Sequence, residues 1–113
     1  MDCIFCKIIA GELPSKKVYE DDKILAFHDI APAAPVHVIV VPKVHMDSLN
    51  DINSVDNAGY ACHALQKLPE IAASQNTSDG YRVVTNIGAD GGQSVSHLHF
   101  HVLGGKKLGI GFV

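Results

Sequence analysis

The sequence predicts an α+β domain in which helices pack on an antiparallel sheet. Three observations point to this class: a short helical pattern opens the chain, three β-rich stretches follow it, and a long helical stripe precedes two more β-rich stretches. Short links join the β-rich stretches, which favours antiparallel neighbours. A chain of 113 residues with 47% hydrophobic content is long enough for one domain, residues 1–113, to bury its own core.

The first helix is expected over residues 3–10, where apolar residues recur at helical spacing. Gly11 closes this pattern and Pro14 stops it. Residues 18–20 and 24–27 flank the charged stretch EDDK, which predicts two antiparallel strands joined by a turn.

A loop and then a central strand are expected next. The prolines of DIAPAAP, residues 29–35, remove amide donors and push the residues before them out of helical geometry. Residues 36–41, VHVIVV, are apolar on both faces apart from His37, which predicts a strand that is covered on each side. Pro42 is expected to end this strand.

The long helix is expected from Asp56 to about Gln75, with Asn53 or Ser54 as its N-cap. Its apolar stripe consists of Tyr60, Ala64, Leu65, Leu68, Ile71 and Ala72. Pro69 lies inside this stretch and is expected to kink or split the helix.

Two strands and a flexible connector complete the expected fold. Residues 81–87, YRVVTNI, are β-rich, and residues 97–103 form the last β-rich stretch. Between them, the glycines of GADGGQS predict a flexible connector over residues 88–94.

The last stretch carries His97, His99 and His101, each separated from the next by one apolar residue. Because side chains alternate along a strand, the three rings are expected to form a row on one face, at a rise of ~3.3 Å per residue. A neutral imidazole can act as a nucleophile, a proton shuttle or a metal ligand, and charge on one ring disfavours charge on the next. A single such histidine is ordinarily a satisfied core residue, but three in register each need a partner. The row therefore predicts a functional site.

The connector before the histidines is rich in hydrogen-bond donors. Gly88, Gly91 and Gly92 allow backbone amides to turn toward an anion, and Gln93 and Ser94 add side-chain donors. Gly-Asp-Gly-Gly by itself is more often only a turn. Next to the histidine row, however, it predicts a place where a phosphate is bound and attacked.

Charge and composition argue against several classes of partner. The net charge is −3 with a pI of about 6.1, and the basic residues are scattered, so we expect no nucleic-acid binding, although a single nucleotide could still occupy a pocket. The N-terminus lacks the pattern of a signal peptide, and the longest apolar stretch is too short to span a bilayer. We therefore expect a cytoplasmic chain that binds no membrane.

The chain has three cysteines, an odd number that argues against a disulfide framework. Cys3 and Cys6 have the CxxC spacing that lets two thiolates meet one zinc ion. His45 and one histidine of the row could complete a Cys₂His₂ tetrahedron. Cys62 is expected to be a small buried residue of the long helix.

At this point a family resemblance can be stated. HLHFHVL fits the His-φ-His-φ-His-φ-φ pattern of the histidine triad (HIT) superfamily, and DGGQSVSHLHFHVLGG resembles its Hint branch, the purine nucleoside phosphoramidate hydrolases. FHDIAPAAPVHVIVVPKVH resembles the ribose-binding and strand segments of that branch, and RVVTNIG resembles the strand before its glycine loop. The resemblance runs from about Cys3 to Gly105. It implies a HIT-like fold with a five-stranded antiparallel sheet and one long and one short helix, and a homodimer whose sheets pair into ten strands.

The resemblance implies catalytic roles that need no catalytic metal. His99 would attack the α-phosphorus of a purine nucleoside phosphoramidate or an aminoacyl-adenylate, and water would release the nucleoside monophosphate from the nucleotidyl-histidine. His101 and His37 would hydrogen-bond phosphate oxygens, and Ser94 would lie near the leaving group.

The resemblance also implies binding residues. The ribose would be bound by Asp29. The phosphate would be held by Asn86, Gly92, Gln93 and Ser94. The purine would be walled by Ile4, Phe5, Ile8, Phe27 and Ile30. By similarity to some bacterial members, a structural zinc without an open position would be held by Cys3, Cys6, His45 and His97.

Two alternatives remain open. The chain could be a non-catalytic nucleotide-binding module that acts through a protein partner, although the intact histidine row argues against it. The row could instead hold a catalytic metal, since a His-x-His pair plus another histidine is a sound zinc triad. The C-terminal stretch KKLGIGFV lacks the tryptophan-bearing tail of many Hint-branch proteins, which leaves the preferred leaving group open.

Overall fold

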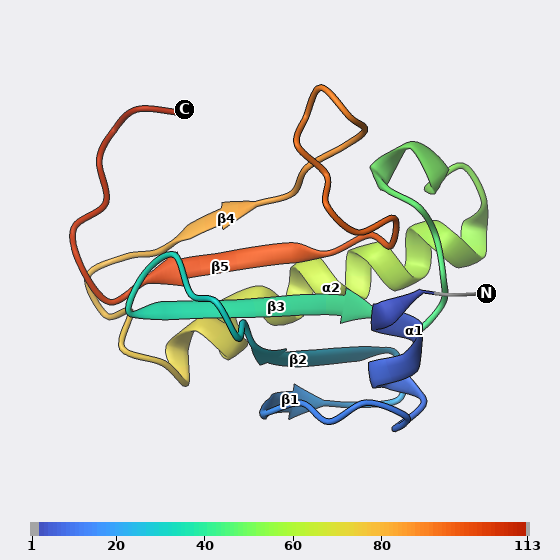
Figure 1. Ribbon diagram of the computed structural model, residues 1–113, viewed down its shortest axis with the longest axis horizontal. Coiled ribbons are helices and arrows are strands. Elements are labelled where there is room, and N and C mark those ends of the chain that lie inside the picture. Colours follow the sequence, from blue (N-terminus) through green and yellow to red (C-terminus); the bar gives the residue numbers. More distant parts are fainter. Residues whose placement is uncertain (1–2, 113) are drawn as a thin grey trace.

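The computed structural model describes residues 3–112 and has the order of helices and strands that the sequence predicts (Figure 1). One 3₁₀ turn before the long helix was not expected. The elements are α1 (Ile4–Ile9), β1 (Lys17–Glu20), β2 (Ile24–His28), β3 (Val36–Pro42), the 3₁₀ turn η1 (Leu49–Asp51), α2 (Val55–Ala73), β4 (Arg82–Val84) and β5 (Phe100–Gly104).

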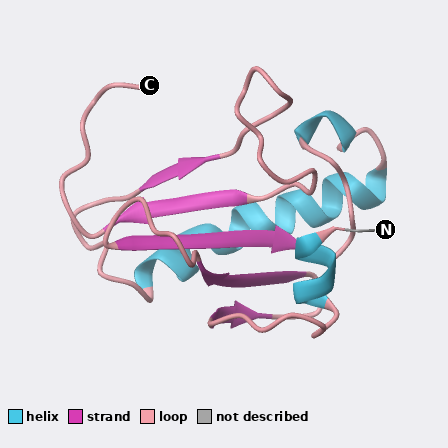
Figure 2. Ribbon diagram, in the orientation of Figure 1, coloured by secondary structure: helices cyan, strands magenta, loops and turns pink. Residues whose placement is uncertain are grey.

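The five strands form one sheet in the order β1-β2-β3-β5-β4, and all neighbouring strands are antiparallel (Figure 2). This confirms the predicted α+β fold with one long helix and a short one. After β3 the chain passes through α2 to β4 at the sheet edge, and β5 then returns between β4 and β3. In the resulting register Ile39 pairs with His101 and His37 pairs with Leu103. His37 and His101 are therefore diagonal neighbours on one face of the sheet.

The sheet buries both of its faces along β3. Val38 and Val40 lie in the apolar cluster shared with α2, whereas Ile39 and Val41 lie in a second cluster with Phe5 of α1. All seven residues of β3 are buried, which confirms the prediction of a central strand covered on each side. Each face thus has its own core, and the histidines lie on the α1 side.

Helix α2 begins at a defined cap and is not split. The Ser54 hydroxyl accepts a hydrogen bond from the Asn57 amide over 3.1 Å, so the N-cap is one of the two predicted residues. The helix continues through Pro69, which is exposed, so that the carbonyl it leaves without a helical donor can be hydrated. Among residues 3–112, no helix is both long and apolar enough to cross a membrane.

The prediction for Cys62 is wrong, because this side chain is exposed. The buried stripe of α2 is Ala61, Ala64, Leu68, Ile71 and Ala72, which follows the 3.6-residue period. Position 62 lies one residue off this stripe and therefore turns outward.

The two C-terminal strands differ from their predicted limits. β4 covers residues 82–84 instead of 81–87, and β5 covers residues 100–104 instead of 97–103. Beyond β4, the hydroxyl of Thr85 donates to the carbonyl of His99 over 2.8 Å, so a side chain replaces the backbone ladder there. A β-rich composition indicates which residues suit a pleated sheet, but it does not indicate where the pairing of two strands ends.

Candidate active site and metal cluster

The histidines of the last segment face one side even though only His101 lies in a strand. The ring centroids of His99 and His101 are 4.9 Å apart, and Phe5 contacts His99 edge-to-face at 4.9 Å. His97 is 0% exposed and His99 is 3% exposed. The predicted alternation thus continues for three residues beyond the hydrogen-bonded ladder.

His37 joins this group from β3 through a hydrogen bond whose direction can be assigned. The Ala33 amide donates to Nδ1 of His37 over 2.9 Å, so this nitrogen carries the lone pair. The proton of neutral His37 is therefore on Nε2, which donates to Nδ1 of His101 over 2.8 Å. His101 then keeps its own proton on Nε2 and offers it as a donor.

His99 has the opposite polarity. Its Nδ1 donates to the carbonyl of His97 over 2.7 Å, so Nε2 of the neutral ring carries the lone pair. Two neighbouring rings thus present different functions: His99 offers an electron pair and His101 offers an N–H. A nucleophile beside a fixed hydrogen-bond donor is suited to attack on an anionic centre.

The pKa values agree with these proton positions. Burial, together with the adjacent His99 and His37 rings, lowers the pKa of His101 to about 4. Burial also lowers the pKa of His37, and the Asp29 carboxylate opposes this effect. Oδ2 of Asp29 lies 3.4 Å from Nε2 of His37. Both His37 and His101 are therefore neutral at pH 7, as the assigned hydrogen bonds require.

Asp29 lies where β2 passes into the proline-containing loop. Its Oδ1 accepts a hydrogen bond from the Ala31 amide over 2.7 Å, which shapes the turn. Asp29 and His37 also border an open cavity of about 750 Å³, within the ~300–1,000 Å³ range of small-molecule sites. The cavity is lined by Pro14, Ser15, Lys16, His28, Asp29, Ile30, Pro32, Pro35 and His37.

The residues expected to wall a purine divide into two groups. Ile30 is fully exposed at the 750 Å³ cavity. Phe5 and Phe27 are 6% and 5% exposed and contact each other edge-to-face at 5.7 Å, with Ile8 packed against the same cluster. Ile4 is 47% exposed and lines a separate hollow. The structure thus brings Ile30 to the cavity and puts both phenylalanines in the core behind the histidines.

The connector between β4 and β5 is held by the side chains that were expected to bind phosphate. Nδ2 of Asn86 donates to the Gly91 carbonyl over 2.8 Å, and the Gly88 amide donates to Oε1 of Gln93 over 2.9 Å. Nε2 of Gln93 donates to the Asp47 carbonyl over 2.5 Å, which ties this loop to the one after β3.

Gly92 and Ser94 of the same connector are exposed. Gly92 has a φ of +76°, a conformation that glycine adopts without strain. Ser94 borders a hollow of about 460 Å³ together with Asp47 and Ser96. This hollow is distinct in its lining from the cavity at Asp29.

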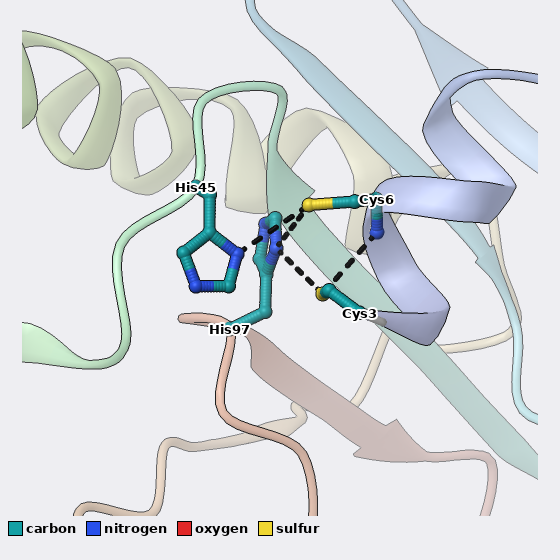
Figure 3. A group of neighbouring side chains, drawn as sticks. All are labelled: Cys3, Cys6, His45 and His97. Atoms are coloured by element: carbon teal, nitrogen blue, oxygen red, sulfur yellow. Dashed lines mark hydrogen bonds between the residues drawn. The ribbon is translucent and has the colours of Figure 1, made fainter. Parts of the chain in front are cut away.

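Cys3, Cys6, His45 and His97 converge from three segments of the chain (Figure 3). Their four ligand atoms lie within 4.8 Å of one another. The Sγ atom of Cys3 lies 3.4 Å from Nδ1 of His97, and that of Cys6 lies 3.4 Å from Nδ1 of His45. With Zn–S bonds of about 2.3 Å and Zn–N bonds of about 2.0–2.1 Å, such spacings suit one tetrahedral ion.

Both histidines of this cluster have a lone pair directed at the thiols. Nε2 of His97 donates to the Pro42 carbonyl over 2.9 Å, and Nε2 of His45 donates to Oδ1 of Asp47 over 3.0 Å. Each Nδ1 is therefore free of a proton, as a metal ligand must be. Burial and the adjacent Cys3 raise the pKa of Cys6, so without a metal this thiol stays protonated and can donate to the imidazoles.

A second group that could hold a metal has the opposite proton arrangement. Single ligand atoms of Asp29, His37 and His101 also lie within 4.8 Å of one another. Here, however, the Ala33 amide occupies Nδ1 of His37, so the proton of His37 points into the group. A metal on Nε2 would move that proton to Nδ1, where it would face the amide N–H. This arrangement suits proton relay better than metal binding.

Several groups of both sites were missed by reasoning from sequence. The Ala33 amide and the Pro42 carbonyl are backbone groups, and nothing in their residue types marks them. Asp47 is two residues after His45, and this His-x-Asp spacing was an available signal that the carboxylate accepts a hydrogen bond from the ring of His45. The prolines that line the 750 Å³ cavity were expected only to stop the first helix, at Pro14, or to shape the loop, at Pro32 and Pro35.

Fold and site together define a class: small α+β proteins that gather imidazoles on one face of the two central strands of an antiparallel sheet and of the segment just before the second of them. The family model of the HIT domain matches residues 10–108. The chain therefore belongs to the HIT domain family.

Relatives match along nearly their whole length. Protein HitA of Neisseria gonorrhoeae is 45% identical over 103 residues, which cover 91% of this chain and 95% of that protein. A histidine triad protein from Clostridium difficile is 53% identical with a TM-score of 0.89, covering 96% of this chain and 95% of that one. A HIT family hydrolase from Clostridium thermocellum is 42% identical with a TM-score of 0.93, covering 99% and 97%.

Proposed function

We propose that this chain is a Hint-branch nucleotide hydrolase that cleaves the P–N bond of purine nucleoside phosphoramidates, or the corresponding bond of aminoacyl-adenylates. The observation that carries the proposal is the polarity of two neighbouring rings: a lone pair on Nε2 of His99 and an N–H on Nε2 of His101. The similar protein from Clostridium thermocellum is described as a HIT family hydrolase, which supports hydrolysis as the reaction class.

The proposed reaction has two displacements at phosphorus. Nε2 of His99 forms a bond to the α-phosphorus while the P–N bond breaks. The electron pair of the P–N bond leaves with the amine, which takes a proton from the solvent beside Ser94. Water then attacks phosphorus, the P–Nε2 bond breaks, and its electron pair returns to His99 while the water loses a proton to solvent. From a phosphoramidate, the products are a nucleoside monophosphate and an amine. From an aminoacyl-adenylate, the P–O bond of the anhydride breaks instead, and the amino acid leaves as its carboxylate.

The contacts of the histidines favour the charged states of this reaction. When Nε2 of His99 is bonded to phosphorus the ring is cationic, and the 2.7 Å hydrogen bond from Nδ1 to the His97 carbonyl becomes charge-assisted. The N–H of His101 can donate to a non-bridging phosphate oxygen as its charge grows. These interactions strengthen along the reaction, which is what catalysis requires.

His99→Ala tests the proposed chemistry. We expect turnover of a fluorogenic adenosine phosphoramidate to fall at least ~10³-fold, because the nucleophile is gone, while the Kd for adenosine monophosphate changes only a few-fold. The matched control is His63→Ala, which removes a histidine of α2 that hydrogen-bonds Asp21. Retained turnover in His99→Ala would overturn the mechanism, and a folded wild type that binds nucleotide without turnover would favour a binding module.

We further propose a structural zinc ion bound by Cys3, Cys6, His45 and His97. Support comes from the converging donors and from the two Nδ1 atoms held free of protons. Four protein ligands would leave no position for water, so the metal would tie the start of α1 to the sheet. We expect close to one zinc per chain by elemental analysis, and Cys3→Ser to lower both zinc content and melting temperature. Zinc-free wild-type protein would refute this proposal.

A homodimer and a reducing compartment complete the proposal. At the β1 edge of the sheet, Lys17 and Glu20 form an ion pair, whereas the β4 edge exposes apolar Val83. The β4 edge is therefore the one suited to pair with a second copy in a ten-stranded sheet.

The three cysteines are free, which fits a reducing compartment and supports a cytoplasmic location. The proposed single domain would then fold without disulfides.

A further inference from the structure

We infer that Cys3, Cys6 and His45 are positioning residues for the nucleophile, because they hold His97, whose carbonyl sets the orientation and tautomer of His99. Metal loading of the cluster would thus control the reactive nitrogen as well as the fold. The inference rests on the proposed function in two respects: it takes His99 as the reacting group and the cluster as a metal site.

His99 lies outside the sheet that would otherwise fix it. β5 begins at Phe100 and β4 ends at Val84, so residues 97–99 have no partner strand in the ladder. Their cross-chain backbone contacts are the Leu98 amide to the Met46 carbonyl at 2.7 Å and the Thr85 hydroxyl to the His99 carbonyl at 2.8 Å. Neither of these contacts the His97 carbonyl.

His97 belongs to both sites at once. Its ring is held at both nitrogens, by the Pro42 carbonyl at 2.9 Å and by the thiols of Cys3 and Cys6 at 3.4 and 3.6 Å, and it is 0% exposed. Its carbonyl accepts the Nδ1–H of His99 over 2.7 Å. The ring and the carbonyl of His97 are attached to the same Cα atom. If the ring leaves the cluster, the backbone of His97 rotates and its carbonyl changes direction.

Phe5 provides a second connection between the two sites. Cys3 and Cys6 flank it in the sequence, and its ring contacts His97 at 6.0 Å and His99 at 4.9 Å between centroids. When the two thiols bind one ion with His45 and His97, α1 is fixed against the sheet and Phe5 is fixed against the ring of His99. Loss of the cluster therefore weakens two restraints on the ring of His99: the hydrogen bond to the His97 carbonyl and the contact with the Phe5 ring.

The restraint matters because only one tautomer of His99 is reactive at Nε2. Without the His97 carbonyl, the proton of the neutral ring can move to Nε2, which removes the lone pair that attacks phosphorus. Loss of a hydrogen-bond partner that orients a metal-ligating side chain typically lowers metal affinity or activity about 10–100-fold, and we expect a similar loss here. We expect a kcat effect of that size. The effect on KM should be small, since Cys3 and His45 line the separate hollow of about 460 Å³ at Ser94, and no residue of the cluster lines the 750 Å³ cavity at Asp29, where the nucleoside would bind.

The test compares zinc-loaded and chelated full-length protein by two readouts. In ¹⁵N-histidine-labelled protein, His99 should give the shifts of a single Nδ1–H tautomer when loaded and of a tautomer mixture when stripped. In parallel, kcat should fall at least ~10-fold, KM should stay within about twofold, and added zinc should restore both readouts. Cys62→Ser, which removes the exposed cysteine of α2, should respond to chelation as the wild type does.

Asp47→Asn keeps the test decisive if the stripped protein unfolds. This variant weakens the acceptor of His45 Nε2, so it should need about 10–100-fold more zinc for loading and regain wild-type kcat at saturation. A kcat that merely follows the folded fraction, an unchanged His99 tautomer in folded metal-free protein, or a wild type that binds no zinc would each overturn the inference. Absence of phosphoramidate turnover in the loaded wild type would refute the proposed function alone, and the NMR readout would still decide the coupling.

Discussion

The position of individual protons distinguishes the two histidine sites. At His37 a backbone donor, the Ala33 amide, forces the proton onto the nitrogen that faces His101. At His97 a backbone acceptor, the Pro42 carbonyl, draws the proton away from the thiols. The same side chain is therefore suited to proton relay in one place and to metal binding in the other, depending on which backbone group it meets.

Acid should destabilise the protein through His37 and His101. Their folded pKa values lie below the ordinary value of 6.5, with His101 at about 4, so between these limits the unfolded chain binds more protons and stability falls as the pH falls. From pH 7 to 5, we expect a loss of unfolding free energy on the order of 1 kcal/mol for His101, measured by urea denaturation. His101→Gln should show a shallower decline, and an equal decline in both proteins would contradict the assignment.

We expect Asp29 to distinguish ribonucleotides from deoxyribonucleotides. In Asp29→Ala, we expect the Kd for adenosine monophosphate to rise ~10-fold or more and the Kd for the 2′-deoxy nucleotide to rise less, because the carboxylate that would accept hydrogen bonds from the ribose hydroxyls is lost. Calorimetric titration of both nucleotides gives the comparison. Asp29 also accepts the Ala31 amide, so a purely structural role would weaken both ligands equally.

Among the loops and helices, the connector between β4 and β5 depends on a close approach of its backbone. A Cβ atom added at Gly91 would lie 2.3 Å from the Ile87 carbonyl oxygen, so the turn closed by Asn86 has no space for a side chain. In α2, by contrast, a Cβ atom at Gly59 would meet nothing within 4 Å. The same residue type is thus required in the connector and merely tolerated in the helix.

Two glycine substitutions should therefore have opposite effects on stability. Gly91→Ala is expected to lower the unfolding free energy by about 1–3 kcal/mol, since the loop must rearrange. Gly59→Ala should raise it by about 0.5–1 kcal/mol, because alanine has the higher helix propensity. Chemical denaturation of both variants measures the difference, and destabilisation by Gly59→Ala would show an unseen constraint on α2.

Across the whole molecule, the two edges of the sheet differ in character. The β1 edge carries charged side chains, and Glu20 binds both Lys17 and Lys43 at 2.8 Å. The β4 edge has three residues: the guanidinium of its one charged residue, Arg82, donates to the Gly109 carbonyl, and apolar Val83 is 40% exposed. A charged edge resists pairing with another chain, whereas an apolar one invites it, so a dimer should form through β4.

Val83→Lys should shift the protein toward the monomer. A charge at the β4 edge would be desolvated on pairing, so we expect the mass from light scattering to fall from twice the chain mass toward the chain mass of 12.1 kDa. Ile52→Lys alters a residue of the same 40% exposure before α2 and should leave the mass unchanged. A monomeric wild type would contradict the proposed dimer.

Much of the fold could be predicted because local chemistry specifies it. The apolar run of β3, interrupted only by His37, the cap at Ser54 and the stop after α1 each depend on neighbouring residues, and all three are confirmed. The limits of β4 and β5 could not be predicted, because pairing ends where a Thr85 side chain replaces the ladder. For the candidate site, the sequence indicated the histidines. It also predicted that Asn86 and Gln93 bind phosphate, but it did not indicate that their side-chain amides hold the connector between β4 and β5.

By itself, the sequence determined which elements form, their order, and which residue types could carry chemistry, because periodicity, caps and side-chain type are local properties. Only the tertiary structure decided which nitrogen of each histidine carries a proton and that Cys3, Cys6, His45 and His97 converge. Those properties depend on backbone carbonyls and amides that distant segments bring into contact. A residue list does not contain that information, since it specifies donors and acceptors without their partners.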